Sequence, residues 1–147
     1  MDRRDEAEAT VYRLLARRDH SREELRRKLA DRDHAPEVIA ALIEEMEEAG
    51  YLNDRRFALH QAAILARKEW GPLRIHQKLR ARGVDDHLID DALDALPDDH
   101  SFRDAARHRL LRKFGDPADF DDRDKQRAYR HLVHRGYPPG LVRGLIF

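Results

Sequence analysis

The chain has 147 residues, in which 29 lysines and arginines balance 29 aspartates and glutamates, and it contains no cysteine. This length is typical of about one ordinary domain, and the lack of cysteine excludes disulfides, thiolate nucleophiles and thiolate metal sites. A net charge of zero argues against a strongly basic DNA-coating protein, so any polyanion would have to be met by a local cationic patch.

Apolar residues three and four apart predict helices throughout the chain, and strand signals are absent. The first predicted helix covers Val11 to Arg18. The second starts at Ser21, which forms a capping box with Glu24. The third covers Val38 to Met46 and is stopped by Gly50.

Three further helices are predicted in the middle of the chain, and their ends are marked by turn and capping residues. Asn53 caps the first of these helices, and Gly71 ends it. Pro72 occupies the first position of the next helix, where its missing N–H costs nothing. The remaining boundaries are a left-handed turn at Gly83, a cap at Asp85 and a stop at Pro97.

The last third of the sequence predicts three more helices. The first begins after Ser101, whose side chain caps it together with Asp104 in a weaker capping box. A longer turn from Gly115 to Asp122 follows, and Gly136 ends the second helix. A short final helix begins after Pro138 and Pro139.

The sequence repeats itself at a shift of 50 residues and then of 53, which is typical of helical arrays. At the first shift, Leu25, Leu29, Arg32, Val38, Ile39 and Ile43 match Ile75, Leu79, Arg82, Leu88, Ile89 and Leu93. At the second, Leu79, Arg82, Gly83, Leu88, Ile89 and Leu93 match Leu132, Arg135, Gly136, Leu141, Val142 and Ile146.

The predicted fold is therefore all-α, with three tandem three-helix repeats over residues 1–50, 51–98 and 99–147 that form an elongated curved array. Each repeat alone buries little apolar surface, so neighbouring repeats should stack and share a core. A compact nine-helix bundle is the alternative, because both arrangements place the same residues inside.

Charge is segregated along the chain. Residues 1–50 hold 10 basic and 14 acidic groups, a balance of −4, residues 51–100 hold 8 and 9, a balance of −1, and residues 101–147 hold 11 and 6, a balance of +5. The middle helix of the second and third repeats is basic, whereas the third helix of the first two is acidic. The basic middle helices could contact nucleic acid, and the acidic third helices could contact a basic protein surface.

Arg74, Lys78 and Arg82 recur every four residues, so they share one helical stripe that can follow a phosphate backbone. Arg82 also occupies the same slot as Arg32 and Arg135, where a cation opposes the helix dipole. Structural and contact roles for this slot both remain open. Six aromatic residues fall at helix ends or on apolar faces, where packing is favoured over base stacking: Tyr51, Phe57, Trp70, Phe102, Phe114 and Tyr137. Trp70 is the exception, because it lies between cations at a helix junction.

The sequence contains no pattern typical of an enzyme. It lacks both the phosphate-loop string and the Gly-x-Ser-x-Gly string, and we expect no catalytic residue and no cofactor. His131 and His134 share a helical face without a third ligand, and the Asp86, Asp90 and Asp94 stripe has the character of a solvated face, so no metal site is expected. The longest apolar run, Val38 to Ile43, is too short for a membrane span, which predicts a soluble cytoplasmic protein.

Two strings carry a family resemblance. YLNDRRFA at residues 51–58 and GPLRIHQKLRARGV at residues 71–84 resemble the signature stretches of the RecX family of bacterial recombination regulators. Three positions depart from the family pattern. Asn53 stands where aspartate is usual, Lys78 replaces a glutamate, and Asp33 takes the glycine slot of the first repeat.

The resemblance implies three tandem three-helix units and a partner, the RecA nucleoprotein filament on single-stranded DNA, with weaker binding to single-stranded DNA alone. It further implies a negative regulator, a monomer without enzymatic activity, that inhibits ATP hydrolysis and strand exchange and promotes filament disassembly. The candidate contact residues are Arg56, Arg67, Lys68, Arg74, Lys78, Arg82 and Arg135. The residues expected to hold the second unit together are Phe57, Ile75, Leu79, Leu88 and Ile89.

A stand-alone nucleic-acid-binding helical repeat protein is the alternative function, with the Arg74, Lys78 and Arg82 stripe as its binding surface. A helical adaptor for an unrelated protein is a third. Binding to naked DNA that falls steeply with salt would favour the second function, whereas strong binding to filaments and weak binding to bare DNA would favour the first.

Overall fold

A computed structural model describes residues 2–97 and 100–147. Within these ranges the secondary structure consists of nine α-helices and one short 3-10 helix, with no strand. The helices are α1 (Arg3–Arg17), α2 (Arg22–Ala30), α3 (Pro36–Glu48), α4 (Asp54–Arg67), α5 (Pro72–Ala81), α6 (Asp86–Asp94), α7 (Phe102–Phe114), α8 (Asp122–His134) and α9 (Pro139–Ile146), and the 3-10 helix η1 (Pro117–Asp119) lies between α7 and α8. The all-helical fold predicted from the sequence is confirmed.

Capping residues begin most of these helices as the sequence predicts. The Ser21 hydroxyl accepts from the amide of Glu24 and completes the capping box of α2. Asn53 caps α4 in the same way. The prediction for Asp85 is only partly correct. This residue occupies the N-cap position of α6, but its side chain makes no capping hydrogen bond.

The predicted helix stop at Gly71 is wrong. Helix α4 ends four residues earlier, and the left-handed residue that follows it is Glu69, with φ of 65°. Gly71 has φ of −77° and caps the start of α5. Glycine is needed there for a different reason, because a Cβ atom would lie only 2.2 Å from the backbone carbon of Gly136. The left-handed turn expected at Gly83 is present, with φ of 86°.

The buried side chains form three hydrophobic clusters, one for each group of three helices, which we call unit 1 (α1–α3), unit 2 (α4–α6) and unit 3 (α7–α9). Four of the five residues expected to hold unit 2 together are fully buried, and Leu88 is half-buried. The predicted repeat boundaries stay a prediction, and two residues near them take part in these clusters. Leu52 completes the first cluster, and Phe102 packs against both the second and the third. The predicted boundary between residues 98 and 99 lies outside the described residues.

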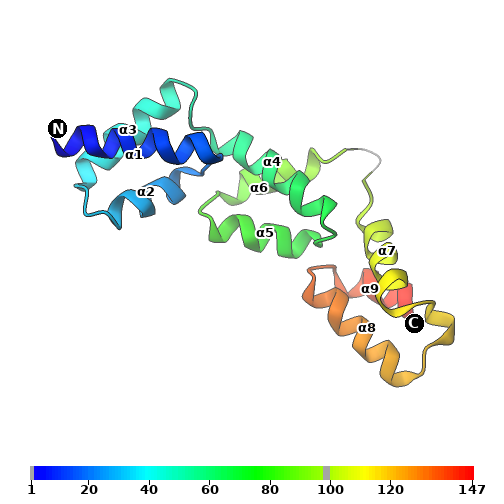
Figure 1. Ribbon diagram of the computed structural model, residues 1–147. Coiled ribbons are helices and arrows are strands. Elements are labelled where there is room, and N and C mark those ends of the chain that lie inside the picture. The colour runs from blue at the N-terminus through cyan, green and yellow to red at the C-terminus, as the bar shows by residue number, and fades with distance from the viewer. Residues whose placement is uncertain (1, 98–99) are drawn as a thin grey trace.

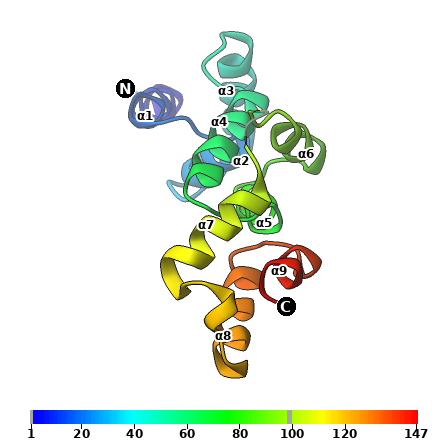
Figure 2. The same cartoon turned by 90° about the vertical axis from the view of Figure 1, so that its right-hand side faces the viewer.

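The three units follow one another in an extended arrangement, with the N-terminal helix in unit 1 at one end and the C-terminus in unit 3 at the other (Figure 1). The view turned by 90° shows unit 3 projecting beyond units 1 and 2, with no second layer of helices around them (Figure 2). This elongated array rules out the compact bundle considered as the alternative. None of the described helices is long and apolar enough to cross a membrane.

Candidate filament and nucleic-acid interface

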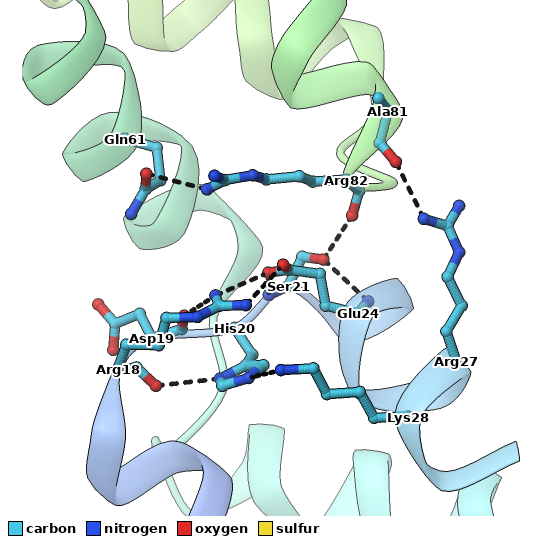
Figure 3. A network of polar contacts seen from close by, with 10 residues as sticks. All are labelled: Arg18, Asp19, His20, Ser21, Glu24, Arg27, Lys28, Gln61, Ala81 and Arg82. Atoms are coloured by element: carbon cyan, nitrogen blue, oxygen red, sulfur yellow. Dashed lines mark hydrogen bonds and ion pairs between the residues drawn. The ribbon is translucent and has the colours of Figure 1, made fainter. Parts of the chain in front are cut away.

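The junction between units 1 and 2 joins the start of α2 to the end of α5 (Figure 3). The Ser21 hydroxyl donates to the carbonyl oxygen of Arg82 at 2.6 Å, and the Arg27 guanidinium donates to that of Ala81 at 2.9 Å. Carbonyl groups at the end of a helix have no partner within it, so these two donors satisfy groups that would otherwise face solvent.

The junction between units 2 and 3 repeats this arrangement with backbone donors. The amide of Gly71 donates to the carbonyl of Arg135 at 2.9 Å, and the amide of Leu73 donates to that of Gly136 at 3.0 Å. Helices α2, α5 and α8 therefore meet end to end, and we call them the middle-helix column. The positive end of one helix dipole meets the negative end of the next, which is favourable at both junctions. Figure 1 shows the three helices following one another along the array.

Arg82 has a packing role at the first junction. Its guanidinium donates to Oε1 of Gln61 in α4 at 3.0 Å (Figure 3). The same group lies 6.0 Å from the centre of the Phe57 ring. Its backbone carbonyl is the acceptor for Ser21. This geometry supports the structural role that the sequence left open, and its contact with a partner stays a prediction.

Cations gather around Trp70 at the second junction. The Arg135 guanidinium lies 3.6 Å from the centre of the indole ring, and the Lys78 ammonium lies 4.2 Å from it. Both positions are within the range of a cation–π interaction. Trp70 is only partly exposed and packs against the unit 2 core. The two cations therefore cover Trp70. Together with its ring, Lys78 and Arg135 form a mixed aromatic and basic surface.

Arg135 is held in this position by hydrogen bonds. Its guanidinium donates to the carbonyl oxygens of Lys68 at 2.5 Å and Glu69 at 3.3 Å, and the Tyr137 hydroxyl also donates to Glu69, at 2.8 Å. Burial lowers the pKa of Arg135 below its ordinary value, and the nearby Arg109 acts in the same direction. We use the name Trp70 cluster for the set at this junction, which consists of Lys68, Trp70, Arg74, Lys78 and Arg135.

Arg74 enters this cluster through the backbone contact between the units. A Cβ atom built on Gly136 would lie 2.3 Å from that of Arg74, which shows how closely the start of α5 approaches the end of α8. The Arg74 guanidinium donates to Gln77 at 2.6 Å through one of its terminal nitrogens. The stripe of Arg74, Lys78 and Arg82 thus spans both junctions and is partly buried along its length.

Two candidate residues lie away from the Trp70 cluster. Arg56 is in the first turn of α4 and donates to the carbonyl of Gly50 at 3.2 Å. Arg67 is exposed in the last turn of α4, roughly 16 Å further along the helix axis, and lines a shallow pocket beside Asp104 and His108. The contacts therefore bring together the candidates at the second junction, and the binding roles of all seven stay a prediction.

Sequence reasoning missed the role of Glu69. Its carboxylate lies 2.7 Å from Nδ1 of His108 and 2.6 Å from the Arg112 guanidinium, so it joins the end of unit 2 to α7. Asp19 and His60 form the corresponding contact between units 1 and 2, at 3.8 Å. The signal was available in the sequence, because both acidic residues follow the first helix of a unit and both histidines lie at the same position of the next first helix.

Tyr51 packs against another helix, although it does not enter a core. Its side chain is 55% exposed, and its ring meets that of Tyr12 in α1, which is 44% exposed, edge to face at 5.9 Å. The next residue, Leu52, enters the unit 1 core. Phe57 and Tyr137 are fully buried, as expected of packing residues.

The histidines and carboxylates considered as metal ligands have other neighbours. Arg109 donates to Nε2 of His131 at 2.9 Å, and Asp86 and Asp90 each approach His76, at 3.7 and 3.6 Å. In residues 2–97 and 100–147, no three histidine, aspartate or glutamate side chains are placed to share a metal ion.

His131 should make the protein less stable in acid. Burial, assisted by Lys113 and Arg109, lowers the pKa of His131 from 6.5 to about 4. The unfolded chain therefore binds the proton more readily, so this contribution to stability is complete above pH 6.5 and is lost as the pH falls toward 4. In His131→Gln, which keeps an acceptor for Arg109, we expect the melting temperature to fall less over this range.

The measurement is a series of thermal melts of both proteins from pH 7 to pH 4. Burial also lowers the pKa of His20, so part of the acid sensitivity should persist in the variant. An identical pH dependence in the two proteins would contradict the assignment to His131.

The geometry defines a class of protein, an extended array of three-helix units with an end-to-end basic column. The sequence of this chain matches the family models of two RecX domains. The second three-helix domain matches residues 53–93, and the first matches residues 7–46. The regulatory protein RecX of Trichlorobacter lovleyi is 37% identical over 106 residues, which cover 70% of this chain and 69% of that protein. The chain belongs to the RecX family.

Other similarities agree with this assignment. A regulatory protein RecX of Salmonella paratyphi A is 36% identical over 96 residues, which span 65% of this chain and 57% of that protein. The crystal structure of RecX from Lactobacillus salivarius has the same fold, with a TM-score of 0.83 at 18% identity over 97% of this chain and 94% of that one. A second crystal structure of a regulatory protein RecX also gives 0.83, at 19% identity, over 98% of this chain and 71% of that one.

Proposed function

We propose that this protein is a negative regulator of homologous recombination. By this proposal it acts in the cytoplasm as a monomer and binds RecA filaments on single-stranded DNA. It inhibits ATP hydrolysis and strand exchange and promotes filament disassembly. The observation that carries the proposal is the Trp70 cluster, which places a basic and aromatic surface at a unit junction of a RecX family array.

The shape and charge of the array support a nucleoprotein partner over bare DNA. Several cations of the column are half-buried or hydrogen-bonded to the chain itself, which limits the number available to phosphates. Unit 1 carries an excess of acidic groups, which would repel DNA but attract a basic protein surface. A filament offers both kinds of surface along its groove, whereas naked DNA offers only one.

The proposed mechanism requires no chemistry from this chain. A rigid, elongated body that contacts several protomers of a helical filament can oppose the changes that accompany ATP turnover, because it binds one arrangement of the protomers more tightly than another. The end-to-end junctions of the column would supply the rigidity that such a role needs.

The proposal predicts that the purified protein slows ATP hydrolysis by RecA assembled on single-stranded DNA. The rate should fall as the protein is added and should reach its minimum near the ratio at which the filament is saturated. Unchanged turnover at stoichiometric protein would contradict the proposal. An unrelated ATPase measured with the same reagents serves as the control for interference with the assay.

A comparison of binding partners separates this function from that of a stand-alone nucleic-acid binder. Binding to single-stranded DNA and to the filament is measured over a range of salt concentrations. We expect tight binding to filaments and weak binding to bare DNA. Equal affinity for both, with a steep loss in salt, would favour the alternative.

A further inference from the structure

An open groove lies on unit 1, between α2 and α3, away from the Trp70 cluster. It has a volume of about 850 Å³. Its floor includes Ile39 and Ile43, and small side chains, Ala30 and Ala40, line its walls. Charged residues of both helices surround this apolar centre.

Unit 2 closes the same position with polar contacts. The residues that correspond to Ala30, Pro36 and Ala40 at the shift of 50 are Arg80, Asp86 and Asp90. His76 lies 3.7 Å from Asp86 and 3.6 Å from Asp90, and Arg80 lies 3.8 Å from Asp86. These side chains bridge α5 and α6 across the equivalent surface.

Unit 3 places a pair of aromatic rings at this position, of which Phe147 stays largely exposed. The residues that correspond to Arg26 and Glu44 of unit 1 are Tyr129 and Phe147. Their ring centres are 6.3 Å apart in an edge-on arrangement, and the Arg143 guanidinium lies 5.6 Å from the Tyr129 ring. The chain therefore covers this surface from within in two units, and leaves it open in the first.

The charges around the unit 1 groove are unevenly paired. Glu23 binds Arg26 at 2.9 and 2.6 Å, and Glu47 binds Arg22 at 3.2 Å, so both cations of the groove are compensated. The carboxylates of Asp33 and Glu44 have no ion pair within 4.0 Å among residues 2–97 and 100–147. The uncompensated charge at the rim is therefore negative.

We infer that this groove docks a segment of the filament protein that inserts one aromatic or aliphatic side chain between α2 and α3. Lysine or arginine residues beside that side chain would face Asp33 and Glu44, which accounts for both the apolar floor and the acidic rim. The inference rests on the proposed function, and it assigns protein contact to the groove on unit 1 and phosphate contact to the Trp70 cluster.

A second copy of this chain is a poorer match for the groove. Its most exposed aromatic side chain is Phe147, which is 63% exposed and carries the terminal carboxylate beside it. That carboxylate would be brought close to Asp33 and Glu44, and like charges repel each other.

Two variants of the full chain test the inference, one by filling the groove and one by reversing its charge. Arg26→Tyr combined with Glu44→Phe copies the aromatic pair that unit 3 carries at this position. Glu44→Lys reverses an exposed charge without filling the space. Glu48→Lys is the matched control, because it makes the same change on the same helix at an exposed residue outside the groove.

Binding is measured with purified RecA filaments on single-stranded DNA, and separately with the DNA alone. We expect both groove variants to bind filaments about tenfold more weakly, with unchanged affinity for bare DNA, whereas Glu48→Lys binds as the unaltered protein does. Thermal melts of each variant establish that the fold is retained.

The contrary outcomes differ for the two proposals. Normal filament binding by both groove variants would overturn the groove inference and leave the proposed function intact. Equal losses in Glu44→Lys and Glu48→Lys would overturn it as well, since general electrostatics would then suffice. A change in oligomeric state caused by the groove variants would assign the groove to a second copy. Failure of the unaltered protein to bind filaments would remove both proposals.

Discussion

Replacing Gly71 with alanine should strongly destabilise the junction between units 2 and 3. The added Cβ would lie 2.2 Å from the backbone carbon of Gly136 and 2.4 Å from its oxygen. Gly71 has an ordinary φ of −77°, so the cost comes from this contact and not from backbone strain. The atoms that the methyl group would meet belong to the backbone of Gly136 and Tyr137, which cannot move aside as a flexible side chain would.

The expected loss is on the order of 1–3 kcal/mol in the free energy of unfolding, measured by urea denaturation. Trp70 lies at this junction, so its fluorescence should report the change directly. Gly144→Ala is the control. Its Cβ would meet no atom within 4 Å, and it lies inside α9, where alanine is favoured over glycine. Equal stability of the Gly71 variant and the unaltered protein would show that the two units are not held by this close approach.

Reversing two cations of the Trp70 cluster should have the largest effect on function. In Lys68→Glu combined with Lys78→Glu, the net charge changes by four at the junction between units 2 and 3. We expect filament binding to weaken by about tenfold or more. The slope of log binding constant against log salt concentration should become shallower by about 1.4, the value for two lost contacts to single-stranded DNA. Lys78→Glu also removes a cation from the Trp70 ring, which should cost about 0.5–1 kcal/mol of stability.

The matched control carries the same change in net charge at exposed positions of α1 and α7, as Arg13→Glu combined with Arg103→Glu. If binding depends on the Trp70 cluster, the control should retain most of its affinity and should still inhibit ATP hydrolysis by RecA. Similar losses in both double variants would show that only the overall charge matters. Circular dichroism and melting temperatures separate loss of binding from loss of fold.

Much of the fold could be predicted from the sequence because local signals are strong in this chain. The spacing of Leu25 and Leu29, and of their counterparts Ile75 and Leu79, marks the buried face of each middle helix, and all four are fully buried. Caps at Ser21 and Asn53 act within three residues of themselves. Such features depend on neighbours along the chain, which a single sequence displays.

The candidate site was less accessible to the same reasoning. Arg82 and Arg135 occupy equivalent slots in the repeat, yet Arg82 donates to a glutamine of its own unit whereas Arg135 stacks on Trp70 and donates to carbonyls of the preceding unit. Periodicity placed both arginines at a helix end. It did not show which groups each arginine would meet across a junction. The exposure of Tyr51 escaped prediction for the same reason, since its ring contacts Tyr12, 39 positions earlier in the sequence.

The sequence by itself determined the all-helical class, the threefold periodicity and the residues that fill each core, because these follow from the spacing of apolar side chains. Only the tertiary structure decided which units touch and through which atoms. The approach of Gly71 to Gly136 and the contact of Glu69 with α7 involve elements distant in sequence. The open groove on unit 1 depends on how α2 and α3 pack against each other. Their positions depend on how rigid helices pack in three dimensions, and hydrophobic periodicity carries no information about that packing across a junction.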